Sequence, residues 1–504
     1  QSSLNPEFLT YKGGGTGFLG TARDRALPGT LKITTLETLP LDNPTFRGFS
    51  PPSIAPSQEV ADNRDAAARL LSGRSMGVDT AEAPLDFTFS LSAGTVLEDF
   101  MGGRLGVIGA LSYAKAYKLK RGFRGTDSLF RDPVTQQNLL QTERLFYFEE
   151  GEESLLAGGL LSIGWQGDAQ DTIKLTVFSN LAAEDQAQFA IGEDDSTNNL
   201  DDGFNPLEEG LPIFRESLVY TERKLSTIQL SGEHVFDDDR DIKVDWAAAY
   251  AWSSQDQPDI RFSNYGFDIP NNQFFGLSND IPGERFERIW RKLDDTNYNL
   301  NLNIEVPIGE SSDGKERSKI KFGGAFDHSD RVYNTENFAY KVDFLPQPIG
   351  YSIPRVLGPS DRGGLTLADQ LGRADLTDSF QSPPAFNIDS TYLARTKTPP
   401  GTENYIARQN IAATYVMATF NMSEDVEVVA GARVESTDIT VRSGSTFDSL
   451  DPLAGGFIFN DLITGEPIPL EEVLNPGIQA TDLLPAMAIS WDFAEKMTLR
   501  SSVS

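Results

Sequence analysis

The stretch Tyr298-Asn299-Leu300-Asn301-Leu302-Asn303-Ile304 alternates asparagine with apolar residues. Successive side chains of an extended strand point to opposite faces, so a period of two predicts a β-strand with one amide face and one apolar face. The same alternation recurs over 86–93, 242–252 and 426–435. Long two-faced strands that recur in one chain predict a large closed sheet, apolar on one face and polar on the other.

Short polar turns join the predicted strands in antiparallel pairs. The pairs are 85–93 with 105–113, 160–165 with 173–178, 218–234 with 242–252, 298–306 with 320–326, 405–420 with 426–440, and 486–491 with 497–503. A further strand near 6–12 brings the expected number to about thirteen.

Much longer connections separate these pairs and are rich in Gly, Pro, Asn, Asp and Ser. They cover 13–84, 114–143, 180–215, 254–295, 328–404 and 441–481. Compact soluble domains rarely contain so many long connections. Short turns at one rim and long loops at the other are typical of an outer-membrane barrel with periplasmic turns and extracellular loops. One amphipathic helix is expected over 58–71, with Ser57 as its N-cap.

Composition is compatible with this layout. Apolar residues make up 39% of the chain, and the mean hydropathy is −0.32. No apolar run reaches the ~18 residues of a membrane-spanning helix, whereas a transmembrane barrel needs only alternate apolar residues. The net charge of −31 makes a nucleic-acid partner unfavourable. The absence of cysteine excludes disulfides, thiolate catalysis and cysteine metal sites.

Alternation also assigns the two faces. Tyr298, Leu300 and Leu302 are expected to face lipid, and the asparagines to face the lumen. Trp252, near one end of the apolar series, fits an aromatic belt at the membrane interface. Periodicity leaves one alternative open, a soluble sandwich or propeller in which the apolar residues face a protein core.

Candidate chemistry is sparse. The two histidines are His234, beside a short turn, and His328, at the start of a long connection. Neither lies near a serine that the sequence singles out as a nucleophile, so no catalytic residue is assigned and no enzyme activity is expected. Gly13–Gly15 lacks the lysine and helix of a phosphate loop. The acidic run Glu193–Asp202 could hold calcium but has no EF-hand spacing, so a solvated loop is the default and neither metal nor cofactor is expected.

Ligand contact is expected at loop tips and in the upper lumen. The connection 254–295 carries an arginine and several aromatic residues that could stack on a ligand or instead pack the loop upon itself: Arg261, Phe262, Tyr265, Phe267, Phe274 and Phe275. Arg408, Arg433 and Glu435 are assigned to the lumen.

Several segments resemble TonB-dependent outer-membrane receptors, in the version common in Bacteroidetes-like transporters. They are Leu4–Gly20 with Arg25-Ala26-Leu27-Pro28, Trp252–Phe262, Tyr405–Val441 and Leu483–Ser504. The sequence departs from the family pattern at Gly17, where an aspartate is often found.

The resemblance implies a barrel of roughly 22 strands with a plugged lumen. Because neither end of the sequence reads as a natural terminus, 1–504 is expected to be part of that barrel domain, without the plug domain or the last strands. The resemblance also implies an outer-membrane receptor for active uptake of a scarce siderophore, oligosaccharide or peptide. Arg408, Arg433 and Glu435 would then contact the plug, and the TonB complex would act through the plug. A passive porin-type channel and a soluble β-rich surface or adhesion protein are the alternatives.

Overall fold

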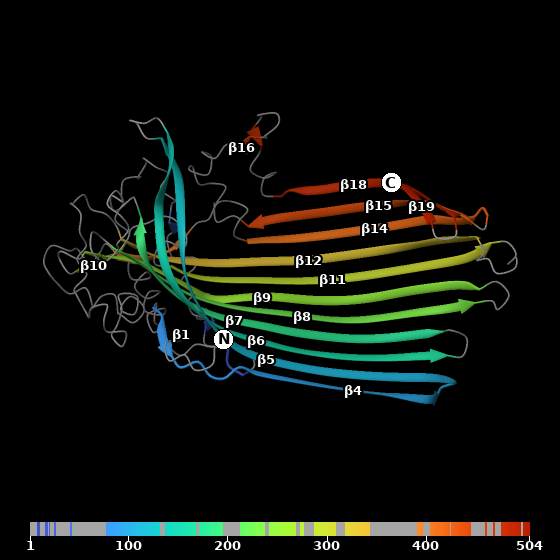
Figure 1. Ribbon diagram of the computed structural model, residues 1–504, viewed down its shortest axis with the longest axis horizontal. Helices are drawn as coiled ribbons and strands as arrows, with labels where there is room; N and C mark the ends of the chain where they lie inside the picture. Colours follow the sequence, from blue (N-terminus) through green and yellow to red (C-terminus); the bar gives the residue numbers. More distant parts are fainter. Residues whose placement is uncertain are drawn as a thin grey trace.

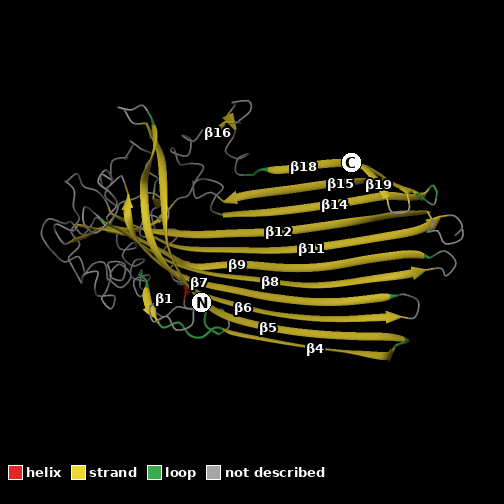
Figure 2. Ribbon diagram, in the orientation of Figure 1, coloured by secondary structure: helices red, strands yellow, loops and turns green. Residues whose placement is uncertain are grey.

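The computed structural model describes residues 8–10, 16–18, 20, 25–26, 41–42, 77–131, 137–167, 171–194, 212–236, 241–268, 273–276, 287–308, 318–342, 391–396, 404–423, 425–444, 459–460, 467–468, 475–494 and 497–504. Within these ranges the regular elements are β-strands, apart from a helical turn at Arg25 (Figure 2). None of the described helical structure is long and apolar enough to cross a membrane. The helix expected over 58–71 and the glycines at 13–15 lie outside the described residues.

The described strands assemble mainly into one large sheet (Figure 1). Its main path contains twelve antiparallel strands in chain order. They are β4 (Phe87–Phe100), β5 (Gly103–Arg131), β6 (Asn138–Gly167), β7 (Thr172–Asp194), β8 (Ile213–Phe236), β9 (Ile242–Asp268), β11 (Glu287–Ile308), β12 (Ser318–Val342), β14 (Asn404–Asn421), β15 (Val426–Gly444), β18 (Gly477–Ala494) and β19 (Met497–Val503). The prediction of an all-β antiparallel fold is confirmed.

Shorter strands attach to this path or stand apart from it. β10 (Gln273–Gly276) pairs with β9, β13 (Thr391–Thr396) pairs with β12, and β2 (Leu41–Asp42) pairs with β13. Two small sheets are formed by β1 (Phe8–Thr10) with β3 (Asp79–Ala81), and by β16 (Phe459–Asn460) with β17 (Pro467–Ile468). Among the described residues, β4 pairs only with β5 and β19 only with β18, so the sheet is open.

The predicted hairpins all occur, with the predicted partners. The strand ends that these hairpins join lie together at one end of the sheet, called here the turn end; the opposite end is the loop end (Figure 1). At the turn end, Met101 and Gly102 join β4 to β5 with φ of 50° and 74°. Positive φ at both positions is the geometry of a tight hairpin turn that matches strand twist, and Gly102 adopts it without steric cost.

The strands are much longer than the alternation predicted. β5 and β6 have 29 and 30 residues, and they occupy most of the connection expected over 114–143. In the same way β9 and β11 extend into 254–295, and β12 extends into 328–404. His328 therefore lies within β12 and not at the start of a loop. The reason is that strict apolar and polar alternation marks only the apolar band, and the strands continue beyond it.

The ladder register defines the two faces of the sheet. On β11, Asn297, Asn299, Asn301 and Asn303 lie on one face, called here the amide face. Tyr298, Leu300 and Leu302 lie on the other, called here the apolar face. No described element covers the middle of the apolar face, where Leu300 and Leu302 are 50% and 46% exposed. The alternative of a soluble sandwich core is therefore not what the described strands form.

Aromatic side chains bracket the apolar face at both ends. Toward the loop end lie Tyr113, Tyr250, Trp252 and Tyr298, and toward the turn end lie Trp165, Phe236, Phe420 and Trp491. On β11 the apolar series runs from Tyr298 to Val306, roughly 27 Å along the strand at about 3.4 Å per residue. This is close to the ~25 Å height of the apolar band in outer-membrane barrels, which aromatic girdles flank.

The expected strand near 6–12 is not part of the large sheet, which corrects the prediction. β1 pairs with β3 and lies across β6, with Phe8 and Leu9 buried. Gly151 on β6 permits this crossing, because a Cβ at that position would collide with the carbonyl oxygen of Leu9. The short alternating stretch marked a strand correctly but carried no information about its partner.

Thr16, Gly20 and Arg25 lie on the loop-end part of the apolar face. Thr16 donates from its backbone nitrogen and its hydroxyl to Glu153 Oε1, at 2.8 and 2.6 Å. Tyr220 donates its hydroxyl to the carbonyl oxygen of Gly20 at 2.7 Å, and Arg25 forms a 2.7 Å ion pair with Asp185. The apolar band thus gives way to a buried polar layer at the loop end.

Candidate functional site

The amide face forms a hydrogen-bonded polar track across β9, β11 and β12. Asn297 and Asn299 both donate to Asp327 Oδ2, at 3.2 and 3.4 Å. Asn303 donates to Asp245 Oδ1 at 2.6 Å, and Tyr415 on β14 donates its hydroxyl to Asn303 Oδ1 at 2.6 Å. These bonds orient the amides along the face.

Asn301 differs from the other amides of this track. Register pairs it with Ala247 on β9 and Ala325 on β12, and Ala325 in turn with Ala413. Among the described residues no hydrogen bond engages its side chain, which is partly exposed. The row of alanines leaves room above the backbone, and the amide offers two donors and one acceptor there. The track can therefore bind neutral polar groups such as hydroxyls and amides.

Lysines and carboxylates border the track toward the turn end. Lys319 lies 3.4 Å from Glu305, and Lys321 lies 3.8 Å from Asp245. On β15, Arg433 donates to Glu435 Oε2 from Nε and Nη2, at 3.0 and 2.6 Å. The register places Arg433 and Glu435 on the amide face, as expected from alternation. Whether they contact a plug stays a prediction.

Arg408 lies on the apolar face, and its assignment to the lumen was wrong. The register pairs it with Asp330, which shares the face of Tyr298, and Arg408 Nε donates to Asp330 Oδ1 at 2.9 Å. Within 405–420 the odd-numbered and the even-numbered residues each include polar and apolar side chains. Alternation therefore does not show which set lies on the apolar face. Only the register with β12 does.

Arg261 also differs from the expectation of an exposed ligand-binding side chain. It lies on β9 and is 1% exposed, and Phe262 beside it is partly buried. Tyr265 and Phe267 lie at the end of β9, where they pair with β10, which carries Phe274 and Phe275. The side chains of these last four residues lie outside the described part of the structure. The backbone therefore brings the two aromatic pairs together, whereas Arg261 belongs to the protein interior.

Arg261 belongs to a buried cluster of charged side chains with Asp259 and Arg288, called here the knot. Asp259 interrupts β9 with a φ of 59°, and the ladders to β8 and β11 shift register nearby. Arg261 Nη2 donates to Asp259 Oδ2 at 2.6 Å, and Arg288 donates from Nε and Nη2 at 2.7 and 2.5 Å. A β-bulge of this kind re-aims a side chain, here a carboxylate toward two guanidiniums.

The charge state of the Asp259 carboxyl follows from this arrangement. Asp259 lies beyond the apolar band, toward the loop end. Burial by itself would raise the pKa of its carboxyl, but the Arg288 and Arg261 guanidiniums outweigh burial and hold that pKa well below its usual range. The knot is therefore charged at physiological pH and fixes β9, β11 and their shared bulge. Its role is to position the loop-end strands rather than to react.

The remaining sequence candidates are the two histidines and the acidic run Glu193–Asp202. His234 contacts Asp171 at 3.3 Å and lies parallel to Trp246, and His328 contacts Asn410 and Asp330. Glu193 and Asp194 end β7, and the rest of the acidic run to Asp202 lies outside the described residues. Among the described residues no group of His, Asp and Glu is arranged to hold a metal ion.

Sequence reasoning missed Asp259, Arg288 and Arg25. Each is a charged residue in a stretch without clear alternation, and such a residue reads as part of a solvated loop. The one signal was the pair Asp259 and Arg261, two positions apart, directly before a predicted aromatic cluster.

The chain belongs to the family of TonB dependent receptor-like β-barrels, whose match covers residues 230–504. Among solved structures it is similar to the siderophore receptor PiuA from Acinetobacter baumannii, with 12% identity and a TM-score of 0.33. That match covers 86% of this chain and 52% of the other, so the chain spans about half the length of that receptor. A likeness this distant carries no statement about ligand or mechanism. No curated protein matches the sequence.

Proposed function

We propose that the protein is an outer-membrane receptor that takes up a scarce ligand in a TonB-dependent manner. The observation that carries the proposal is the family match over 230–504, on strands with an apolar band between two aromatic girdles. The receptor binds and moves its ligand and performs no bond chemistry. Siderophores, oligosaccharides and peptides are the ligand classes to test.

The twelve-strand path is proposed to be one wall of the barrel. Its edge strands β4 and β19 have unpaired backbone groups among the described residues. Because lipid cannot hydrogen-bond such groups, a membrane sheet must close, so further strands of the full-length protein are expected to complete the barrel. The amide face would then line the lumen, where Asn301, Arg433 and Glu435 would contact the plug domain. The TonB complex acts through that plug.

Energy coupling separates this proposal from a passive porin-type channel. Cells that carry the full-length protein are to be given labelled candidates from each ligand class, with the proton gradient of the inner membrane intact or collapsed. A TonB-dependent receptor concentrates its ligand only when the gradient is intact. Equal uptake in both states, limited only by solute size, supports the porin. Absence of heat-modifiable migration, which marks folded barrels on gels, would contradict both.

The paired segments β9 and β10 are the proposed ligand contact at the loop end. On β10, Phe274 pairs in register with Phe267 and Phe275 with Gly266, at the loop end, which faces outward in the proposed barrel. Replacing Phe274 and Phe275 with alanine in the full-length protein should weaken ligand binding by ~2 kcal/mol or more, if they are anchors. Substitution of the turn at 237–239, at the opposite end of β9, is the control and should leave binding unchanged. Unchanged binding in both variants would remove β10 from the site.

A further inference from the structure

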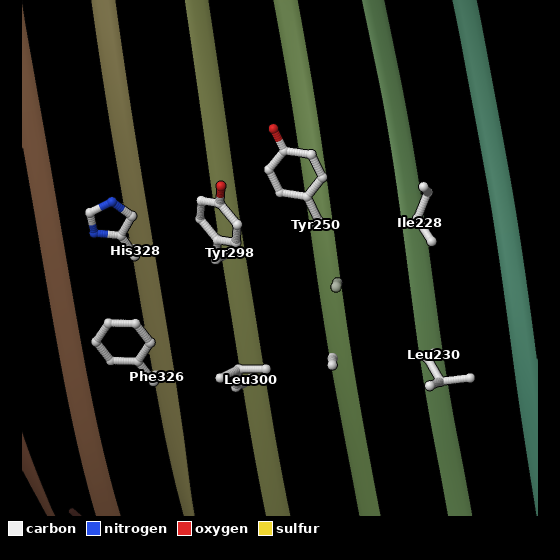
Figure 3. A pocket seen from close by; sticks show the side chains of 9 residues that line it. Ile228, Leu230, Tyr250, Tyr298, Leu300, Phe326 and His328 are labelled. Atoms are coloured by element: carbon white, nitrogen blue, oxygen red, sulfur yellow. The ribbon is translucent and has the colours of Figure 1, made fainter.

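A hollow of about 530 Å³ opens on the apolar face, within β8, β9, β11 and β12 (Figure 3). Its walls are aliphatic and aromatic: Ile228, Leu230, Tyr250, Tyr298, Leu300, Phe326 and His328, with Ala248 and Ala249 between them. This volume lies within the range of ligand-binding pockets in proteins. The hollow is separate from the amide face and from the β9–β10 segments proposed to contact the transported ligand.

One small residue creates the hollow. The register places Leu230, Ala248, Leu300 and Phe326 in a single row across the four strands. Trp246 and Tyr250 lie before and after Ala248 on the same face of β9. A methyl group therefore stands among large side chains, and the depression it leaves is long and apolar. Such a shape accepts a hydrocarbon chain.

Polar groups occur only at the loop-end margin of the hollow. The rings of Tyr250 and Tyr298 lie 4.7 Å apart between centroids, and both hydroxyls point away from Leu230 and Leu300 (Figure 3). His328 lies in the same row, with hydrogen-bonding contacts of 2.6 Å to Asn410 and 2.9 Å to Asp330. The hollow thus has an apolar body and a polar head, and the head lies at the level of the loop-end aromatic girdle.

Arg408 lies next to this polar head, and Arg442 lies one strand further on the same face, toward the loop end. Arg408 has a 60% exposed side chain, and its bond to Asp330 engages Nε, which leaves the outer edge of the guanidinium toward solvent. Arg442 is exposed on β15, opposite Ile406 and diagonal to Arg408, and no described ion pair engages it. Asp438 lies on the same face, with Gln479 donating to it at 3.5 Å. Two guanidiniums on neighbouring strands of one face suit a phosphate group, which Arg binds through more than one hydrogen bond.

We propose that the hollow is a specific lipid site, in which an acyl chain lies over Ala248 and the lipid's phosphate binds Arg408 and Arg442. The proposal rests on the outer-membrane location proposed above, because only there does the apolar face contact lipid. The occupant is a phosphate-bearing acylated lipid of the outer leaflet. Its binding would hold β8 to β15 in their register from the outside, independently of what passes through the lumen.

The test uses the full-length receptor, purified in detergent and mixed with phosphatidic acid or with diacylglycerol of the same acyl chains. Bound lipid per protein is counted by native mass spectrometry. Ala248→Leu fills the hollow and should lower phosphatidic acid binding about tenfold, the effect of losing one well-packed apolar seat. Ala430→Leu, on the same face of β15 and outside the hollow, is the matched control and should bind like the unaltered protein. Arg408→Gln with Arg442→Gln should lower binding of phosphatidic acid but not of diacylglycerol.

Each outcome decides one part of the proposal. Equal lipid binding by Ala248→Leu and Ala430→Leu overturns the acyl-chain seat. Equal loss, or no loss, of both lipids in the double arginine variant overturns the phosphate contact. Heat-modifiable migration is recorded for every variant, and Ala248→Val replaces Ala248→Leu if the latter does not fold. If the unaltered protein lacks heat-modifiable migration, the proposed membrane barrel fails; if it migrates as a barrel without selective lipid binding, only the lipid site fails.

Discussion

Asp259 and Arg288 form a two-point ion pair between neighbouring strands, with distances of 2.7 Å from Nε to Oδ1 and 2.5 Å from Nη2 to Oδ2. Both side chains are fully buried. Arg261 donates to the same carboxylate, so one acidic residue accepts hydrogen bonds from two arginines. The pair spans 29 residues and lies where the ladder between β9 and β11 shifts register.

Asp259→Asn should destabilise the folded receptor by about 3 kcal/mol, because it removes the negative charge from between two buried guanidiniums. Asparagine tolerates the positive φ of this position nearly as well as aspartate, so the loss reports charge and not backbone strain. Urea unfolding of the protein in lipid measures the effect. Asp294→Asn is the control, since its pair with Lys292 is exposed, and should change stability by roughly 0.5 kcal/mol or less. Equal effects of the two substitutions would contradict a special role for the knot.

The stability contributed by Asp259 should depend on pH in one direction. Its pKa is lowered in the folded state, so the contribution is complete above the usual aspartate pKa of about 3.9 and is lost as pH falls toward the folded value. The stability difference between the unaltered protein and Asp259→Asn should stay constant from about pH 8 to 5 and shrink below about pH 4. Measured unfolding free energies at a series of pH values test this; a difference that already shrinks between pH 7 and 5 would oppose it.

Gly151→Ala should displace β1 from its position across β6. The added Cβ meets the backbone of Leu9, which cannot move without breaking the pairing of β1 with β3, and overpacking of this kind costs about 1–3 kcal/mol. Hydrogen exchange should become faster at Phe8–Thr10 and Asp79–Ala81. Gly164→Ala on the same strand is the matched control, because no atom lies within 4 Å of its added Cβ. Unchanged exchange in Gly151→Ala would show that β1 does not cross β6 there.

The two faces can be distinguished chemically, because the chain contains no cysteine. Leu300→Cys should react with a lipid-soluble maleimide from within the bilayer and resist a charged one. Asn301→Cys, the next residue, should show the opposite preference, because successive side chains of a strand point to opposite faces. Labelling of the full-length protein in membranes measures both. Reversed preferences would place the amide face toward lipid.

Sequence alternation predicted the part of each strand that lies in the apolar band, and with it the hairpin partners. The alternation in β9 and β11 is regular because, within the band, each face of the sheet contacts only one kind of environment. Beyond the band both faces contact water or protein, so the alternation disappears although the strand continues. This is why Arg261 was predicted to be a loop residue, and why the strands predicted at 105–113 and 160–165 are shorter than β5 and β6.

The face on which a candidate site residue lies was predictable only where polar and apolar residues alternate clearly along the strand. Arg433 and Glu435 follow a clear alternation and lie on the predicted face, whereas Arg408 lies in a strand with mixed faces. The knot at Asp259 depends on a bulge, which changes parity without leaving a periodic signal. The hollow at Ala248 depends on the register of four strands, and no single strand contains that information.

The segment around Arg25 has a consequence for the order of assembly. Trp290 donates to the carbonyl oxygen of Arg25 at 2.9 Å across 265 residues, and Arg25 pairs with Asp185 across 160. Arg25 can hold both contacts only when β7 and β11 stand in the same sheet, and closing such large loops is slow relative to forming hairpins. Thr16, Gly20 and Arg25 are therefore fixed only after strands that follow them in the sequence, and their docked positions mark a wall whose strands are already in place.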